Sequence, residues 1–162
     1  LFSAFTKLQV TRPNFEIELL CVGDGSLRKS IDYKYKSNDQ IFTPGRIADA
    51  DLIKTYGVAD IFILPSLFEP WGLVVNEAMA ASLPVIVSDR VGCIDDLVSD
   101  QRTGIVVPAN NSEALACAMT RLVDDRDLRL HLGGNGNKLI SSWTLENEAS
   151  NITSVWRTAS SQ

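Results

Sequence analysis

Runs of apolar residues alternate along this chain with stretches in which apolar residues recur at helical spacing. The apolar runs end at glycine, proline or serine, as strands do when they enter turns. The run at 61–64 is apolar without alternation, which is typical of a strand covered on both faces. We therefore predict strands at 15–22, 40–43, 61–64, 85–87 and 105–107.

The stretches between these runs predict helices. Ser112 is a suitable N-cap for a helix whose inner face is apolar, with Leu115, Met119, Leu122 and Val123. Strands separated by helices imply right-handed crossovers and a parallel sheet, so we expect a doubly wound, Rossmann-like α/β fold. The predicted helices are 26–35, 49–59 with an apolar face at Leu52, Ile53, Tyr56 and Val58, 72–81, 94–98, 112–123, 128–140 and 145–157.

Composition narrows the class of protein. The 162 residues suit one domain, and the net charge of −5 argues against a nucleic-acid partner, which needs a basic surface. The cysteines, Cys21, Cys93 and Cys117, are scattered without metal-ligand spacing and predict small buried side chains and no metal site.

Residues 1–8 have helical spacing without a cap or a Met. We therefore expect that the chain begins inside a helix and is one domain, 1–162, of a longer protein.

The candidate chemistry lies where strands end, because ligands of open parallel sheets bind outside the carboxyl ends of the strands. The loop 65–72 places Glu69 before a helix, and Glu77 follows eight residues later inside that helix. The free amides at Gly72, Leu73 and Val74 would favour a diphosphate. Glu77 would then accept hydrogen bonds from ribose hydroxyls, and Glu69 would face the group that the diphosphate carries.

Each of these residues also has a simpler interpretation. An acid early in a helix, such as Glu77, is favourable by ~0.3–1 kcal/mol without any ligand. Glu69 can be a solvated loop acid, Phe68 and Trp71 can pack, and a turn explains the glycine at Gly23. Spacing alone therefore predicts a nucleotide-binding α/β domain and leaves the reaction open.

The segment 64–80 closely resembles the E-x7-E motif of family 4 glycosyltransferases. Other segments resemble motifs of that family in the same order: 22–28, 41–47, 84–88, 103–108 and 142–143. The resemblance implies the carboxy-terminal half of a GT-B enzyme that transfers a sugar, of hexosyl type, with retention of anomeric configuration. The donor would be a UDP-, GDP- or ADP-sugar, with no metal ion and no cofactor.

The same resemblance implies a role for each site residue. Glu69 would be the catalytic residue near the reacting centre, and Glu77 would bind the ribose of the donor. The remaining donor-binding residues would be Gly72, Leu73 and Val74 at the phosphates and sugar, Gly23 near the donor, and Arg46 and Ile47 beside the base. Pro44 and Cys93 stand where the family commonly has other residues, so the donor details carry over less directly than the fold.

The expected partners follow from the resemblance. The acceptor, a glycan or a lipid, would bind an amino-terminal domain outside this chain, together with the Arg and Lys that grip the diphosphate. We expect a cytoplasmic protein, with any peripheral membrane contact supplied by that other half, and no sugar transfer by this piece alone. A non-catalytic nucleotide-binding module of the same fold, or a hydrolase with two carboxylates, would be the alternatives.

Overall fold

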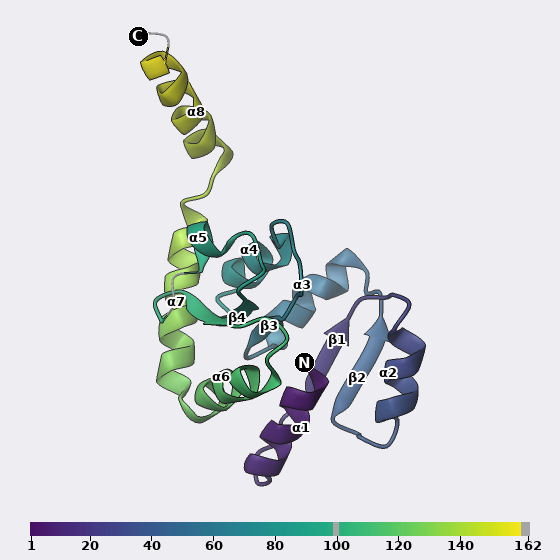
Figure 1. The fold of residues 1–162 in the computed structure, drawn as a ribbon. Coiled ribbons are helices and arrows are strands. Elements are labelled where there is room, and N and C mark those ends of the chain that lie inside the picture. The colour runs from purple at the N-terminus through teal and green to yellow at the C-terminus, as the bar shows by residue number, and fades with distance from the viewer. Residues whose placement is uncertain (99–100, 160–162) are drawn as a thin grey trace.

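The computed structural model describes residues 1–98 and 101–159 as parallel strands connected by helices (Figure 1). The strands are β1 (Leu19–Val22), β2 (Ile41–Gly45), β3 (Phe62–Leu64), β4 (Val85–Ser88) and β5 (Gly104–Val107). The helices are α1 (Phe2–Thr11), α2 (Arg28–Tyr35), α3 (Asp49–Val58), α4 (Leu73–Ala80), α5 (Ile94–Leu97), α6 (Ser112–Asp124), α7 (Arg126–Ser141) and α8 (Leu145–Ala159). The predicted α/β class with parallel strands is confirmed.

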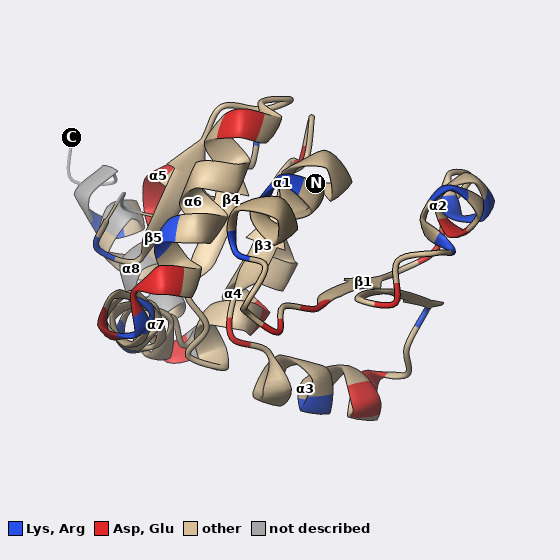
Figure 2. Ribbon diagram, turned by 90° about the horizontal axis from the view of Figure 1, so that it is seen from below, with Lys and Arg blue, Asp and Glu red and all other residues tan. Residues whose placement is uncertain are grey.

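The strands form two separate hydrogen-bonded sheets. One has the order β3-β4-β5, with Phe62 opposite Val85 and Ile86 opposite Ile105. The other is the pair β1-β2, whose register shifts between Leu20 and Val22. In Figures 1 and 2 β1 lies on the side of β3 that faces away from β4. The predicted continuous sheet is therefore divided between β3 and β1.

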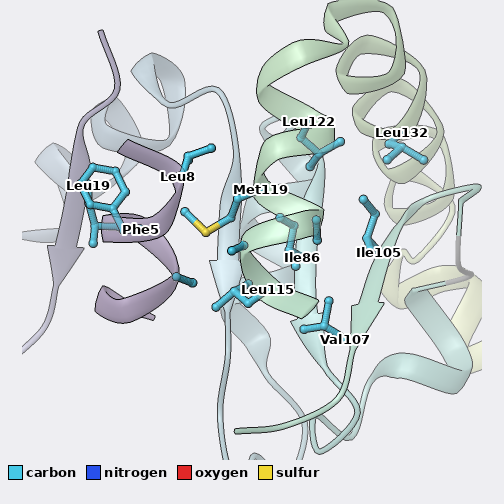
Figure 3. Packing of buried hydrophobic residues seen from close by; sticks show 13 residues of the cluster. Phe5, Leu8, Leu19, Ile86, Ile105, Val107, Leu115, Met119, Leu122 and Leu132 are labelled. Carbon is cyan, nitrogen blue, oxygen red and sulfur yellow. The ribbon is translucent and has the colours of Figure 1, made fainter. Parts of the chain in front are cut away.

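Helix α1 holds the two sheets together. Its residues Phe5 and Leu8 are buried in one apolar cluster with Leu19 of β1, Ile86 of β4 and Met119 of α6 (Figure 3). Ion pairs Lys7–Glu113 and Arg12–Asp124 join α1 to α6 at the surface. The core of the fold thus continues across the division in the strands.

A second apolar cluster covers the opposite face of the larger sheet. Val75 and Met79 of α4 are fully buried there beside Val85 and Val87 of β4. Successive side chains of a strand point to opposite faces, so Ile86 reaches the α1 cluster while its two neighbours reach α4. Burial on both faces explains why this segment is uniformly apolar.

Most predicted boundaries agree with the structure, and the strands predicted at 61–64, 85–87 and 105–107 are confirmed to within one residue at each end. The strand predicted from Phe15 is shorter and begins at Leu19, whose amide donates to Gln40 O at 2.8 Å. Phe15 is 49% exposed, and Glu16 and Glu18 are exposed as well. The charged carboxylates remain in water, where their hydration is retained, and so pairing starts only after them.

Three local predictions were wrong. The α6 N-cap is Asn111, not Ser112, because the Asn111 side chain accepts the Ala114 N–H at 3.0 Å. The apolar face expected on α3 is mostly solvated, with Ile53 73% and Val58 81% exposed. Cys93 is buried as predicted, but Cys21 is only half-buried and Cys117 is exposed. No helix in the described part of the chain has both the length and the apolarity to cross a membrane.

Candidate functional site at the carboxyl ends of β3 and β4

Two loops meet at the carboxyl end of the larger sheet, one after β3 and one after β4. The Glu69 amide donates to Arg90 O at 3.0 Å, and the Gly92 amide donates to Glu69 O at 2.9 Å. The Cys93 amide donates to Trp71 O at 3.0 Å, and the Ser88 hydroxyl donates to Ser66 O. These bonds are mostly between backbone groups, so they fix the course of both loops up to the start of α4.

Two glycines permit this close approach. Gly72 is the N-cap of α4 with φ of 97°, a left-handed conformation that favours glycine. A Cβ on Gly92 would lie 2.0 Å from Pro70 O, which is closer than any real contact. Both positions therefore accept a side chain only if the loops move.

The start of α4 presents unpaired backbone donors. Among the described residues no acceptor is recorded for the amides of Gly72, Leu73 and Val74, while the Val75 amide donates to Gly72 O at 2.8 Å. Leu73 is 69% exposed and Val74 is half-buried, so water reaches this end of the helix. Unpaired amides at a helix start carry partial positive charge and suit an anion.

Glu69 lies beside this helix start. Its Cγ is 3.5 Å from the position that a Cβ on Gly72 would occupy, and the residue is half-buried. Its charge also reaches the buried Cys93 thiol. Burial, with smaller contributions from Asp96 and Glu69, raises the pKa of Cys93 to about 11, so this thiol stays neutral at pH 7.

Glu77 lies one turn further along α4 and is exposed. The Tyr56 hydroxyl from α3 donates a hydrogen bond to Glu77 Oε2 at 2.8 Å. The helical spacing of residues 49–59 predicted only a helix face for Tyr56 and no link to Glu77. No local pattern links them, because they are 21 residues apart and the fold alone brings α3 to α4.

The other predicted donor residues belong to the smaller sheet. Gly23 follows β1, and its amide donates to Gly45 O at 2.9 Å at the end of β2. Arg46, exposed, and Ile47, half-buried, come directly after β2. No hydrogen bond or ion pair among the described residues joins these three to the loop that carries Glu69. The structure therefore places the predicted residues on two parts of the fold. The loop after β3 and the start of α4 carry Glu69, Gly72, Leu73 and Val74. The ends of β1 and β2, in the smaller sheet, carry Gly23, Arg46 and Ile47.

A metal site needs several ligands in one place. Within residues 1–98 and 101–159, no three His, Cys, Asp or Glu side chains come together in a group that could hold a metal ion.

Comparison with known proteins relates this fold to one enzyme class. An uncharacterized glycosyltransferase of Methanocaldococcus jannaschii is 29% identical over 146 residues, which are 88% of this chain and 37% of that protein. The C-terminal domain of a glycosyl transferase group 1 family protein from Francisella tularensis is 27% identical with a TM-score of 0.74, over 88% of this chain and 78% of that one. TarM from S. aureus, solved in complex with UDP, shares the fold with a TM-score of 0.80 at 18% identity, over 94% of this chain and 32% of that one.

The structure matches GT-B glycosyltransferases such as TarM in fold. The chain spans well under half of the curated relatives that it matches first, 37% and 39% of their lengths. Residues 1–139 match the family described as Glycosyl transferases group 1. Because that match covers most of the sequence, the chain belongs to the glycosyl transferases group 1 family.

Proposed function

We propose that this chain is the donor-binding, carboxy-terminal half of a family 4 glycosyltransferase that transfers a sugar with retention of configuration. The observation that carries the proposal is the start of α4, where the amides of Gly72 to Val74 have no acceptor among the described residues. Glu69 stands beside these amides and Glu77 one turn beyond them. A diphosphate needs such donors, and the sugar and ribose on either side of it need acceptors.

Two relatives support the donor and the placement within the protein. TarM was solved with UDP, and the Francisella protein that this chain covers to 78% is a C-terminal domain. By analogy the donor is a nucleotide-sugar, and the acceptor, a glycan or lipid, binds a preceding domain. Gly23, at the end of β1, would lie near the donor, and Arg46 and Ile47, directly after β2, would lie beside the base.

The proposed chemistry uses charge rather than a nucleophile. The helix amides stabilise the negative charge that builds up on the leaving diphosphate. The Glu69 carboxylate, on the sugar side, stabilises the positive charge that develops at the anomeric carbon. Transfer also requires an acceptor held against the donor and water excluded. We therefore expect the 162-residue chain to bind a nucleotide and to transfer no sugar by itself.

Calorimetry with UDP, GDP and ADP, each with and without its sugar, tests donor binding. Glu77→Ala should weaken the binding of the preferred nucleotide at least tenfold, because a charge-assisted hydrogen bond is worth ~1.5–3 kcal/mol. Glu16→Ala, which removes an exposed carboxylate before β1, is the matched control and should bind like the wild type. An affinity of Glu77→Ala within about twofold of wild type, ~0.4 kcal/mol, contradicts the ribose role.

Retention is tested on the complete protein. The anomeric configuration of the new glycosidic bond, read by NMR, should match that of the donor sugar. An inverted product would contradict the family 4 assignment, and sugar transfer by the 162-residue chain alone would contradict the two-domain arrangement.

A further inference from the structure

Tyr56 forms a connection between α3 and α4 beside the proposed donor site. Its ring lies 6.0 Å from the ring of Phe62 on β3 and packs against the apolar cluster under α4. Its hydroxyl reaches out of that cluster to Glu77 Oε2 at 2.8 Å. Of the hydrogen bonds recorded among the described residues, this one alone joins a side chain of α3 to α4.

The Tyr56 hydroxyl keeps its proton and therefore remains a hydrogen-bond donor. Burial, followed by the hydrogen bond to Glu77 and the charge of its carboxylate, raises the pKa of Tyr56 well above its usual value. The proton therefore stays on the phenol at neutral pH, and the carboxylate is the acceptor. The bond uses one of the roughly four lone pairs of the carboxylate, so Oε1 and part of Oε2 stay available.

We propose that Tyr56 is a positioning residue that sets the Glu77 carboxylate for the two neighbouring hydroxyls of a ribose. The inference rests on the proposed function, since it assumes that a nucleotide binds at α4. Glu77 is exposed, and a free glutamate on a helix surface samples several rotamers that are lost when it binds. A hydrogen bond from a half-buried, packed ring restricts those rotamers beforehand, so the nucleotide meets a carboxylate already in one orientation.

A purely structural role for Tyr56 would have a different result. If the bond served only to hold α3 against α4, its loss would lower the stability of the domain and weaken the binding of every nucleotide to the same extent. A positioning role acts on the ribose hydroxyls alone. The discriminating quantity is therefore the ratio of the Kd of a 2′,3′-dideoxynucleoside diphosphate to that of the normal nucleoside diphosphate.

The experiment measures this ratio by calorimetry on the 162-residue chain, using whichever of UDP, GDP and ADP binds and its dideoxy counterpart. Tyr56→Phe should weaken the normal nucleotide about three- to tenfold and the dideoxy form less than about twofold. Glu77→Ala should remove the preference, and the double variant should resemble Glu77→Ala, since the two residues act as one unit. Tyr33→Phe, which removes the same hydroxyl from a 76% exposed tyrosine on α2, is the control and should leave both affinities unchanged.

Each result has a defined meaning. A Tyr56→Phe variant with the wild-type ratio overturns the positioning role, whether or not its stability falls, because the folded fraction affects both Kd values equally. If Glu77→Ala keeps the preference, the ribose role of Glu77 in the proposed function is wrong, and the inference falls with it. If Glu77→Ala removes the preference and Tyr56→Phe does not change it, the proposed function stands and only the inference fails. Absence of binding by all three nucleotides overturns both.

Discussion

The two sheets have the same parallel geometry but differ in how their faces are covered. In β4, Val85, Ile86 and Val87 are 0% exposed, because apolar clusters lie on both faces. In the pair β1-β2, α1 and α2 lie on one side (Figure 2), where the rings of Phe2 and Tyr35 stack at 4.7 Å. On the other face Leu20 remains 45% and Phe42 42% exposed. Strand pairing alone therefore leaves apolar surface in water, and covering it requires a helix on each face.

This difference divides the proposed donor site. Glu69, Gly72 and Glu77 are supported by the sheet whose central strand β4 is fully buried, whereas Gly23 and Arg46 are supported by the pair whose second face is partly exposed. We infer that the diphosphate and sugar contacts are held more firmly than the contacts to the base. The following substitutions test the comparison, from the largest expected effect to the smallest.

Ile86→Ala should cost the most stability. Ile86 is fully buried in the central strand, and such a truncation lowers the free energy of unfolding by ~2–5 kcal/mol. Leu20→Ala, in the half-exposed pair, should cost less than about 1 kcal/mol because less area returns to water. Urea unfolding of both variants measures the difference, and equal losses would mean that the two sheets are equally well covered in solution.

Gly92→Ala should cause the second-largest loss of stability. Its Cβ would meet Pro70 O, so the loop that carries Glu69 must move, at a cost of about 2–3 kcal/mol. Gly25→Ala is the matched control, since a Cβ there has open space around it. Thermal unfolding should separate the two variants, and Gly92→Ala should also weaken nucleotide binding. Wild-type stability in both would show that the loops are not held as closely as described.

Phe42→Thr should have the smallest effect. The side chain is 42% exposed and lies opposite Leu20 in the register, so its replacement should change the unfolding free energy by no more than about 0.5 kcal/mol. A loss above about 1.5 kcal/mol, or one that grows with protein concentration, would show that this face is covered by another molecule in solution. The measurement is urea unfolding at two protein concentrations.

The sequence was most informative where local and tertiary requirements coincide. The turn at Pro70 and Gly72 and the apolar positions after it predicted α4 to within one residue at each end, because helix signals and burial agree there. The placement of Gly72, Leu73 and Val74 at one helix start followed from the same pattern. Whether these residues and Glu69 bind a donor stays a prediction.

Other features depend on contacts between distant segments. The division of the sheet between β3 and β1 has no counterpart in periodicity, because the side-chain pattern of a strand does not show which of its backbone edges is paired. The solvated face of α3 and the exposed Cys117 also depend on which neighbours reach them. Tyr56 was assigned to packing because only the tertiary fold brings its hydroxyl to Glu77.

The attachment between the loops after β3 and β4 bears on how such a domain can evolve. Its bonds run from the amides of Glu69, Gly92 and Cys93 to main-chain oxygens, which every amino acid supplies. Leu67 and Phe68, 69% and 80% exposed on the same loop, make little contribution to that scaffold. New side chains can therefore appear at these two positions without unfolding the loop, so selection for a different ligand has freedom there while the backbone stays constant.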